Sequence, residues 1–455
     1  MASAAHGGPP PGPKLPLWVQ TACFIFVPRR FLSRMHRRYG PMVKLGTAFD
    51  SNFVMVFDPA LVKEVFRGSP ERLRAGEANA PLGSALGSRS VLLLDGEEHL
   101  RQRRLMLPPF HGQRMRAYEE AMRESTDRAI DSWPLDRTFA LLPSMQQLTL
   151  DVILRAVFGV EAGQRQDDLK RALRALVEPV GSRFGLLMMI AMRLGSKRAV
   201  REFMARRRLV DELIYDEISQ RRDQPDLEER EDVLSLLLLA RDEDGRPMTD
   251  EELRDQLVTL LVAGHETTAT GLAWTFDLLL HNPHVLATVK RAVADGDDTY
   301  VDAVAKESLR IRPVVPAIGR VVRGGSFELG GYTLEEGTEI NPSITTIHAR
   351  PDSFVGPRDF RPERFLGDDP PDTYTWIPFG GGTRRCLGAS FALFEMRVAI
   401  RRMIERTTLA AAGPKPERPE RRGVTTVPKT GTRVRLIERR AGASPADAPP
   451  VAAEA

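Results

Sequence analysis

The sequence predicts a mainly α-helical protein with small peripheral β-sheets, an α+β fold built around one long central helix. Residues 59–282 carry mostly helical hydrophobic patterns, interrupted by a few polar loops. Within this region, residues 249–281 contain no proline and would form a helix of roughly 48 Å. After residue 310, short strand-like pieces alternate with glycines, as in small sheets at the edge of a helical protein.

The N-terminal residues support two interpretations. An apolar stretch, residues 15–27, is interrupted by Pro16 and Gln20 and is followed by five arginines up to Arg38. It is either a first helix packed on the domain or an interfacial patch, with apolar residues in lipid and arginines on head groups. It is too short to span a bilayer, and its charges follow the apolar run, so no signal peptide is expected.

The remaining elements follow from local patterns along the chain. Thr249 and Glu252 form a capping-box pattern that starts the central helix. Helices are also expected at 144–158, which is apolar, and at 199–221, which is amphipathic and basic. Strands are expected in a first hairpin at 42–57, in short pieces at 326–329, 332–334 and 338–340, and in a last hairpin at 424–437. We divide the chain into residues 1–39, a single domain at 40–438, and a disordered Ala/Pro-rich tail at 439–455.

The composition narrows the class of protein. Hydrophobic residues make up 42% and charged residues 28%, which suffices for a large core. The two cysteines, Cys23 and Cys386, lie far apart and favour a reducing, cytoplasmic compartment over a disulfide framework. With 65 basic and 61 acidic residues, the net charge of +4 is too small to argue for nucleic-acid binding.

The most informative segment is a glycine-rich loop that contains Cys386. It precedes an apolar, helix-like segment at 389–403. A helix start and neighbouring arginines favour the thiolate, the form of cysteine that binds metal, and consecutive glycines would let a flat ligand approach the backbone. One cysteine cannot build a zinc or iron–sulfur site, but it can supply the proximal ligand of a haem iron.

The spacing in this loop resembles that of a known family. The pattern Phe-x-x-Gly-x-Arg-x-Cys-x-Gly is the haem-binding loop of cytochromes P-450, and its fixed positions are Phe379, Gly382, Arg384, Cys386 and Gly388. The resemblance implies a haem b cofactor (iron protoporphyrin IX) with Cys386 as the axial iron ligand. It also implies that Phe379, Arg384 and Gly388 contact this cofactor.

A second motif lies midway along the predicted central helix, at residues 263–268. Gly264 costs a helix interior about 1 kcal/mol relative to alanine, and an acid followed by hydroxyls is poor core material, so a compensating role is expected. The segment resembles the family's oxygen-activation motif. The resemblance makes Thr267 and Glu266 catalytic, Thr267 as a hydrogen-bonding group and Glu266 as a proton relay, while Gly264 would allow close approach of the macrocycle. His265 is expected to be structural.

Supporting residues are assigned by the same resemblance. Glu307, Arg310 and Arg364 would form a structural network that holds the cysteine loop, although a lone glutamate–arginine pair is usually a solvated helix face. The haem carboxylates would be bound by a set of cations: His99, Arg103, Arg320, His348 and Arg384. His348 is the least typical of these residues, because Arg350 stands before Pro351 at a position where the family often has an acid.

The function implied is a haem-thiolate monooxygenase that uses O₂ to hydroxylate or epoxidise a lipophilic molecule: a fatty acid, terpenoid, steroid or polyketide. Because no redox module is evident in the sequence, electrons would come from a ferredoxin and its reductase. The donor would dock on a basic face formed by Arg101, Arg104, Arg385, Arg401 and Arg402. The substrate pocket would be lined by residues 80–94, 177–192, 262–263, 314–318 and 424–426.

Three alternatives stay open on sequence alone. A peroxide-driven or isomerase-type enzyme shares the expected fold, but its members typically lack the acid–threonine pair present here. A haem-based sensor or carrier would bind the cofactor without turnover. A cysteine regulator without haem is the third.

Overall fold

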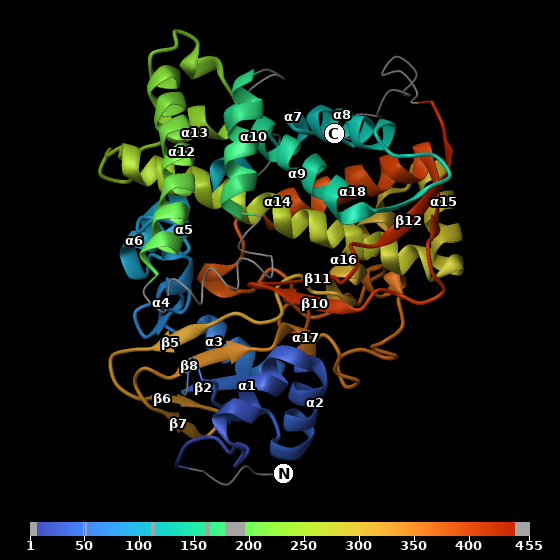
Figure 1. Ribbon diagram of the computed structural model, residues 1–455. Helices are drawn as coiled ribbons and strands as arrows, with labels where there is room; N and C mark the ends of the chain where they lie inside the picture. Colours follow the sequence, from blue (N-terminus) through green and yellow to red (C-terminus); the bar gives the residue numbers. More distant parts are fainter. Residues whose placement is uncertain are drawn as a thin grey trace.

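The predicted central helix is α14 (Asp250–Leu280), which crosses the helical part of the molecule in Figure 1. The computed structural model describes residues 7–48, 50, 52–110, 114–159, 164–177 and 196–441. The N-terminus of α14 carries the predicted capping box: the Thr249 hydroxyl accepts from the Glu252 amide (3.2 Å), and the Thr249 amide donates to the Glu252 carboxylate (2.8 Å). Most side chains of the helix are buried, as a central position requires.

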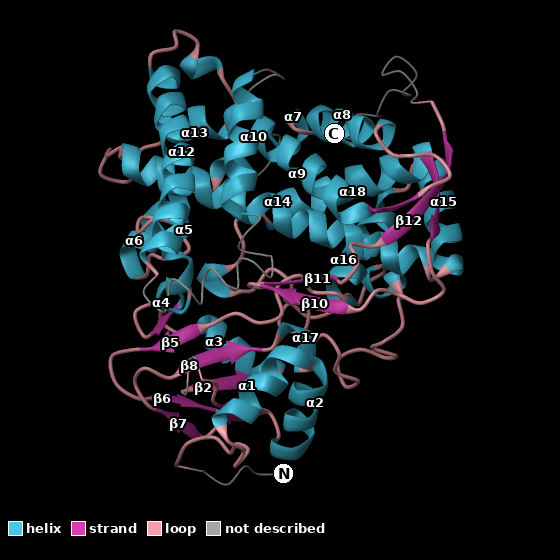
Figure 2. Cartoon of the chain, viewed as in Figure 1, coloured by secondary structure: helices cyan, strands magenta, loops and turns pink. Residues whose placement is uncertain are grey.

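Helices form the larger part of the molecule and surround α14 (Figure 2). Its main neighbours are α9 (Leu141–Phe158), α16 (Asp298–Ile311) and α18 (Ala389–Arg406). The other α-helices are α1 (Leu17–Phe26), α2 (Pro28–Tyr39), α3 (Pro59–Arg67), α4 (Ala75–Ala78), α5 (Gly83–Leu86), α6 (Gly96–Met106), α7 (Arg114–Ala117), α8 (Glu119–Asp131), α10 (Gln164–Val177), α12 (Lys197–Arg222), α13 (Val233–Leu239), α15 (Pro283–Asp295) and α17 (Ile344–Ile347). The 3₁₀ helices are η1 (Ala80–Leu82), η2 (Pro108–Phe110), η3 (Leu227–Glu229), η4 (Pro362–Phe365) and η5 (Gly382–Arg384).

The sheets are small, and most of them lie below the helical part in Figure 2. The largest has the order β1-β2-β8-β5-β3, with β2 and β8 parallel and the other pairs antiparallel. Its strands are β1 (Met42–Leu45), β2 (Phe53–Val56), β3 (Leu73–Arg74), β5 (Arg320–Val322) and β8 (Glu339–Pro342). The other sheets pair β6 (Phe327–Leu329) with β7 (Tyr332–Leu334), β10 (Pro419–Arg422) with β11 (Thr425–Pro428), and β12 (Arg433–Arg439) with both β4 (Thr138–Ala140) and β9 (Thr407–Ala411). The fold is therefore mainly α with small peripheral sheets, as predicted.

The predicted last hairpin, residues 424–437, does not form. β11 pairs with β10, whereas β12 pairs with β4 and β9, so the two strands belong to different sheets. Between them, Gly431 and Thr432 have positive φ angles of 78° and 55°, and the chain there redirects β12 toward β9. The prediction was wrong because a glycine turn between two strand-like runs does not show with which strands the runs pair.

The N-terminal residues pack against the largest sheet. Side chains of α2, including Phe31 and Met35, share a core cluster with residues of β1 and β2. The backbone before α1 also takes part, since the carbonyls of Gly8 and Pro11 accept from the amides of Thr333 and Lys44. In contrast, α1 exposes apolar side chains, with Trp18 and Phe26 at 72% and 80% exposure.

Over the residues that the structure describes, no helix combines the length and apolar character needed to cross a membrane.

Candidate active site

Cys386 lies in the loop between η5 and the N-terminus of α18, and it faces a large cavity. The Cys386 amide donates to the Phe379 carbonyl (2.9 Å), which closes the loop on itself. Gly388 caps α18 directly after it. The cavity has a volume of about 3820 Å³, well above the several hundred Å³ of an ordinary ligand pocket, and Cys386, Phe379 and Gly388 all line it. The loop therefore presents one sulfur to a space large enough for a macrocycle and a second ligand.

The electrostatics of Cys386 differ from the expectation that its surroundings favour the thiolate. Burial raises the pKa of the Cys386 thiol, and this outweighs the lowering by the Gly388 amide, Arg103 and Arg385. The helix start and the arginines act in the expected direction, but desolvation of the sulfur inside the protein is stronger, even though Cys386 is exposed to the cavity. A bound metal ion would supply the missing positive charge, since a coordinating thiol is deprotonated.

The glycines of the loop allow it to pack closely against α3. A Cβ at Gly381 would lie 2.2 Å from Cδ2 of Phe66, and one at Gly382 would lie 2.2 Å from the Phe66 carbonyl oxygen. Gly382 also has a positive φ of 65°, which disfavours other residues. Gly381 and Gly382 therefore bring the loop close to α3, while access for a flat ligand along the glycine run stays a prediction.

All five residues predicted to bind the haem carboxylates line the same cavity as Cys386, and four of them have no role elsewhere that excludes this one. His99 is buried, and its Nδ1 atom has no hydrogen-bond partner among the described residues. Burial, assisted by Arg384, Arg103 and Arg320, lowers the pKa of His99 to about 3, so the imidazole is neutral at physiological pH. Burial also lowers the pKa of Arg320 and of Arg384, each to about 10. This concentration of positive charge with an unpartnered imidazole nitrogen fits a ligand that carries carboxylates.

His348 differs from the prediction that it binds the cofactor. Its Nδ1 atom lies 3.1 Å from the Arg310 carbonyl, and its Nε2 atom accepts from the Ile377 amide at 2.9 Å. Both ring nitrogens are therefore used within the protein, so no donor is left for a carboxylate. His348 instead connects the C-terminal end of α16 to the residues that precede the cysteine loop.

The predicted catalytic pair lies on α14 at the cavity. The Thr267 hydroxyl donates to the Ala263 carbonyl (2.7 Å), which is the side chain-to-backbone bond that the motif suggests. The Glu266 carboxylate accepts from the Gln146 amide group of α9 (2.6 Å). Ala263, Glu266 and Thr267 all line the cavity. The hydroxyl and the carboxylate are thus placed where they can hold and transfer protons.

Gly264 lines the cavity and also packs closely against α9. A Cβ at this position would lie 3.3 Å from Cδ1 of Ile153 in α9, tighter than an ordinary contact. Next to it, the Thr149 hydroxyl of α9 donates to the His265 carbonyl (2.9 Å), and His265 itself is buried with Nδ1 2.8 Å from the Leu261 carbonyl. The glycine therefore brings α9 and α14 together, and His265 has a structural hydrogen bond.

The structure brings Glu307, Arg310 and Arg364 together behind the cysteine loop. Glu307 and Arg310 are fully buried and form a bidentate pair with distances of 2.6 and 2.7 Å. Arg364 donates to the same carboxylate at 3.1 Å, and the Arg361 amide donates to it at 3.0 Å. Because nearly every polar atom of this buried group is paired, its desolvation is offset by hydrogen bonds.

Two residues of the site were missed by the sequence argument. Asp95 forms an ion pair with Arg384 and accepts from the amides of Gly76 and Glu77 (2.8 and 3.1 Å). Gln146 holds Glu266, as described above. Neither residue sits in a motif, and each meets its partner across more than 100 positions of sequence, so no local signal could have identified them.

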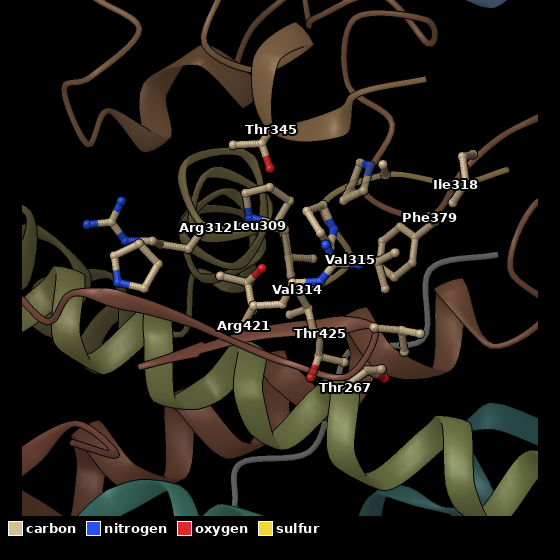
Figure 3. Close-up of a pocket in the computed structure, with 18 of the residues that line it drawn as sticks. Thr267, Leu309, Arg312, Val314, Val315, Ile318, Thr345, Phe379, Arg421 and Thr425 are labelled. Atoms are coloured by element: carbon tan, nitrogen blue, oxygen red, sulfur yellow. The ribbon is translucent and has the colours of Figure 1, made fainter. Parts of the chain in front are cut away.

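One part of the cavity wall is largely apolar. Parts of residues 80–94, residues 262–263, 314–318 and 424–426 line it, as predicted. Figure 3 shows Val314, Val315, Ile318 and Phe379 along this wall, with Thr267 of α14 nearby. The predicted contribution of residues 177–192 falls almost entirely outside the described residues. An apolar wall beside a few polar groups is typical of a small-molecule site.

The predicted docking face is less basic than the sequence suggests. Arg101 pairs with Asp242 and Glu252, and Arg104 pairs with Glu243. Arg401 and Arg402 also pair with acidic residues. Arg385 differs, since it has no carboxylate partner among the residues described. Most of the formal charge of this face is therefore balanced within the protein.

Comparison with known proteins agrees with this geometry. The family model for cytochrome P450 matches residues 9–434. Cytochrome P450 135B1 of Mycobacterium tuberculosis is 42% identical over 442 residues, covering 96% of this chain and 93% of that protein. Cytochrome P450 138 of Mycobacterium bovis is 39% identical, covering 94% and 96%. Among solved structures, the haem domain of cytochrome P450DA has a TM-score of 0.82 at 25% identity (95% and 98% covered), and the retinoic acid-bound cyanobacterial CYP120A1 has 0.80 at 24% (95% and 99%).

Proposed function

The chain belongs to the cytochrome P450 family, and from this premise we propose that it hydroxylates or epoxidises a lipophilic small molecule with electrons from separate redox proteins. Membership makes it a haem-iron monooxygenase that uses O₂, an organic substrate and an electron donor. The observation that carries the proposal is the meeting of Cys386, three arginines, the neutral His99 and the Glu266–Thr267 pair around one cavity. The apolar wall at residues 314–318 supports a fatty acid, terpenoid, steroid or polyketide as substrate.

The residues fit haem b. Cys386 would hold the iron, while His99, Arg103, Arg320 and Arg384 would bind the two carboxylates. When bound, haem b supplies the oxygen activation that the amino acids cannot perform.

The side chains of α14 and its neighbours would control protons at the site. Thr267 would present its hydroxyl to the reacting oxygen, and its bond to the Ala263 carbonyl keeps the side chain in place. Glu266 would exchange protons with solvent while Gln146 restrains its carboxylate. Glu307, Arg310 and Arg364 would act as positioning residues, because their network fixes the segment that leads to the cysteine loop.

The electron donor is proposed to be a ferredoxin with its reductase. Arg385 supports docking near Cys386, because it is the member of the predicted face without a carboxylate partner in the described chain. The two unpaired cysteines support a reducing, cytoplasmic location. Membrane contact through residues 15–38 gains no support from the relatives.

The proposal is tested by replacing each cysteine in turn. Cys386→Ala should lose the thiolate-type Soret band of the reduced carbon monoxide complex and all NADPH-driven turnover with a surrogate ferredoxin chain. Cys23→Ala is the matched control, since Cys23 is the other free cysteine and lies away from the site in the N-terminal cluster. A Cys386→Ala protein that kept the thiolate spectrum would refute the proposal, and a normal spectrum without turnover on any substrate would favour a carrier or sensor.

A further inference from the structure

One branch of the cavity is lined by arginines that are not part of the haem-binding set. Arg312 is the C-cap residue of α16, Arg29 lies in α2, and Arg421 lies in β10. All three line the cavity, and we call them the arginine branch. Among the residues that the structure describes, none of the three forms an ion pair with a carboxylate. Arg310, Arg350 and Arg384 also line the cavity, but each of these is paired with a carboxylate.

Arg312 is the best-defined member of the branch. Its guanidinium lies over the Trp274 ring, 5.1 Å from the centroid, and its Nε atom is buried without a hydrogen-bond partner in the described residues. Burial lowers the pKa of Arg312 to about 10, and the nearby charge of Arg29 acts in the same direction. The residue as a whole is half-buried, but a buried donor atom without a partner costs free energy unless a ligand satisfies it.

Asp277 is the acid that acts on the charge of Arg312, but its carboxylate already has other hydrogen-bonding partners. Asp277 partly offsets the positive charge of Arg312. Its carboxylate, however, accepts from the Glu417 amide (3.1 and 3.2 Å) and lies 3.4 Å from the His281 ring. The other two arginines add further positive charge. Both side chains are exposed, and the surrounding protein nevertheless desolvates them enough to lower the pKa of Arg29, assisted by Arg358, and the pKa of Arg421, whose guanidinium lies 5.4 Å from the Phe24 centroid.

The position of the branch relative to the apolar wall suggests the shape of its ligand. In Figure 3 the Arg312 guanidinium points away from Phe379 and Ile318, and Val314 and Val315 lie between them. The Phe379 carbonyl accepts a hydrogen bond from the Cys386 amide, so Phe379 lies at the end of the cavity where the iron ligand is proposed. A ligand that reaches both ends must therefore combine an anionic head with an apolar body.

We propose that the arginine branch binds the carboxylate of a lipophilic carboxylic acid, whose chain extends along Val314 and Val315 toward Thr267. The planar arginine fork matches a carboxylate in a bidentate manner, and the partly desolvated setting strengthens such a pair. A neutral terpene or sterol would leave the same cations without a partner. The inference rests on the proposed function, and it narrows the substrate class to acids.

The test is a Soret titration of the ferric holoenzyme with hexadecanoic acid and with its methyl ester. In the wild type, the acid should bind about 10- to 100-fold more tightly than the ester, the range expected for charge-assisted hydrogen bonds. Arg312→Gln should abolish most of this preference by weakening the acid and leaving the ester unchanged. Arg312→Lys should retain part of it. Arg435→Gln is the matched control, because Arg435 is an exposed arginine on β12 that does not line the cavity.

Equal affinity of the wild type for acid and ester would overturn the inference, as would an unchanged preference in Arg312→Gln. These outcomes are distinct from failure of the proposed function. If the protein lacked a thiolate-type haem spectrum, or if no lipophilic ligand shifted its Soret band, the monooxygenase proposal itself would be at fault. If terpenes and sterols shifted the Soret band while acids did not, the result would support the monooxygenase proposal and contradict the proposal that the arginine branch binds a carboxylate.

Discussion

At the residue scale, Thr267 gives the most direct test of the proposed proton chemistry. Thr267→Ala removes a hydroxyl that faces the cavity, and we expect product formation to fall about 100-fold while O₂ consumption continues and hydrogen peroxide accumulates. The measurement is hydrogen peroxide and product per O₂ consumed.

Thr275→Ala is the matched control for this experiment. Thr275 lies on the same helix, makes the same kind of bond to the carbonyl four residues earlier (2.9 Å), and is not among the cavity-lining residues. If both variants uncouple to the same degree, the effect belongs to the helix and not to Thr267.

Glu339 in β8 predicts a pH dependence of stability. Burial raises the pKa of Glu339 to about 7, and nearby Asp50 adds to this shift. Because the folded-state pKa lies above the unfolded value, this group contributes most below about pH 4.5, and the contribution is lost as pH rises through 7. Glu339→Gln should therefore stabilise the protein at pH 8 by about 1–3 kcal/mol and have little effect at pH 4.5.

The check on Glu339 is urea unfolding of the two proteins at pH 4.5, 6 and 8. Equal free energies of unfolding at pH 8 would contradict the assignment. A matched surface control is Glu335→Gln, since Glu335 is exposed between β7 and β8.

Single residues show how far sequence reasoning reaches. Cys386, Glu266 and Thr267 could be placed at one site because their motifs have fixed spacing. His348 could not be judged, because its two hydrogen bonds come from Arg310 and Ile377 in other segments. For the same reason, sequence alone could not distinguish Arg312, with its unpartnered Nε atom, from the many paired arginines.

At the element scale, the buried carboxylate of α16 joins three segments. Glu307→Gln would leave Arg310 and Arg364 buried without a counter-charge, and we expect a loss of about 3–5 kcal/mol in the free energy of unfolding. Loss of haem on gel filtration should accompany this, because the network supports the cysteine loop. Glu405→Gln is the control: Glu405 pairs with Arg401 (2.9 Å) and Arg402 (3.3 Å), but both arginines keep a second carboxylate, so its loss should cost about 1 kcal/mol or less. Similar losses for both variants would show that the network gives no special support.

Elements also differ in how well their sequences predict them. α14 was predicted with nearly its true bounds, because its capping box and lack of proline are local properties. β10 was not predicted, and β12 was predicted with the wrong partner, because strand pairing depends on segments far away in the chain. The charged sequence of β10 has no strand-like pattern, and β11 provides the pairing that makes it a strand.

At the scale of the whole molecule, the fold class followed from the balance of long helices and short glycine-separated strands. The arginines of the predicted docking face were a poorer guide to partners, because ion pairs cancel most of their charge. Arg385 is the exception, and it provides a test of donor docking.

Arg385→Gln should lower the second-order rate constant for reduction by a ferredoxin about 2- to 5-fold and reduce its dependence on salt. Arg104→Gln, which removes an arginine already paired with Glu243 at 2.8 Å, should have a smaller effect. The measurement is stopped-flow reduction at several ionic strengths. If Arg104→Gln slowed reduction more than Arg385→Gln, the proposed docking position would be incorrect.

The pairing of β2 with β8 has a consequence for synthesis on the ribosome. These parallel strands are 286 residues apart, the same separation as that of the hydrogen-bonded Asn52 and Thr338. At about 5–20 residues per second, β2 must wait on the order of tens of seconds for its partner to be translated. During that time the apolar strand and the exposed face of α1 are available to chaperones, so the yield of this protein should depend on translation speed and chaperone supply.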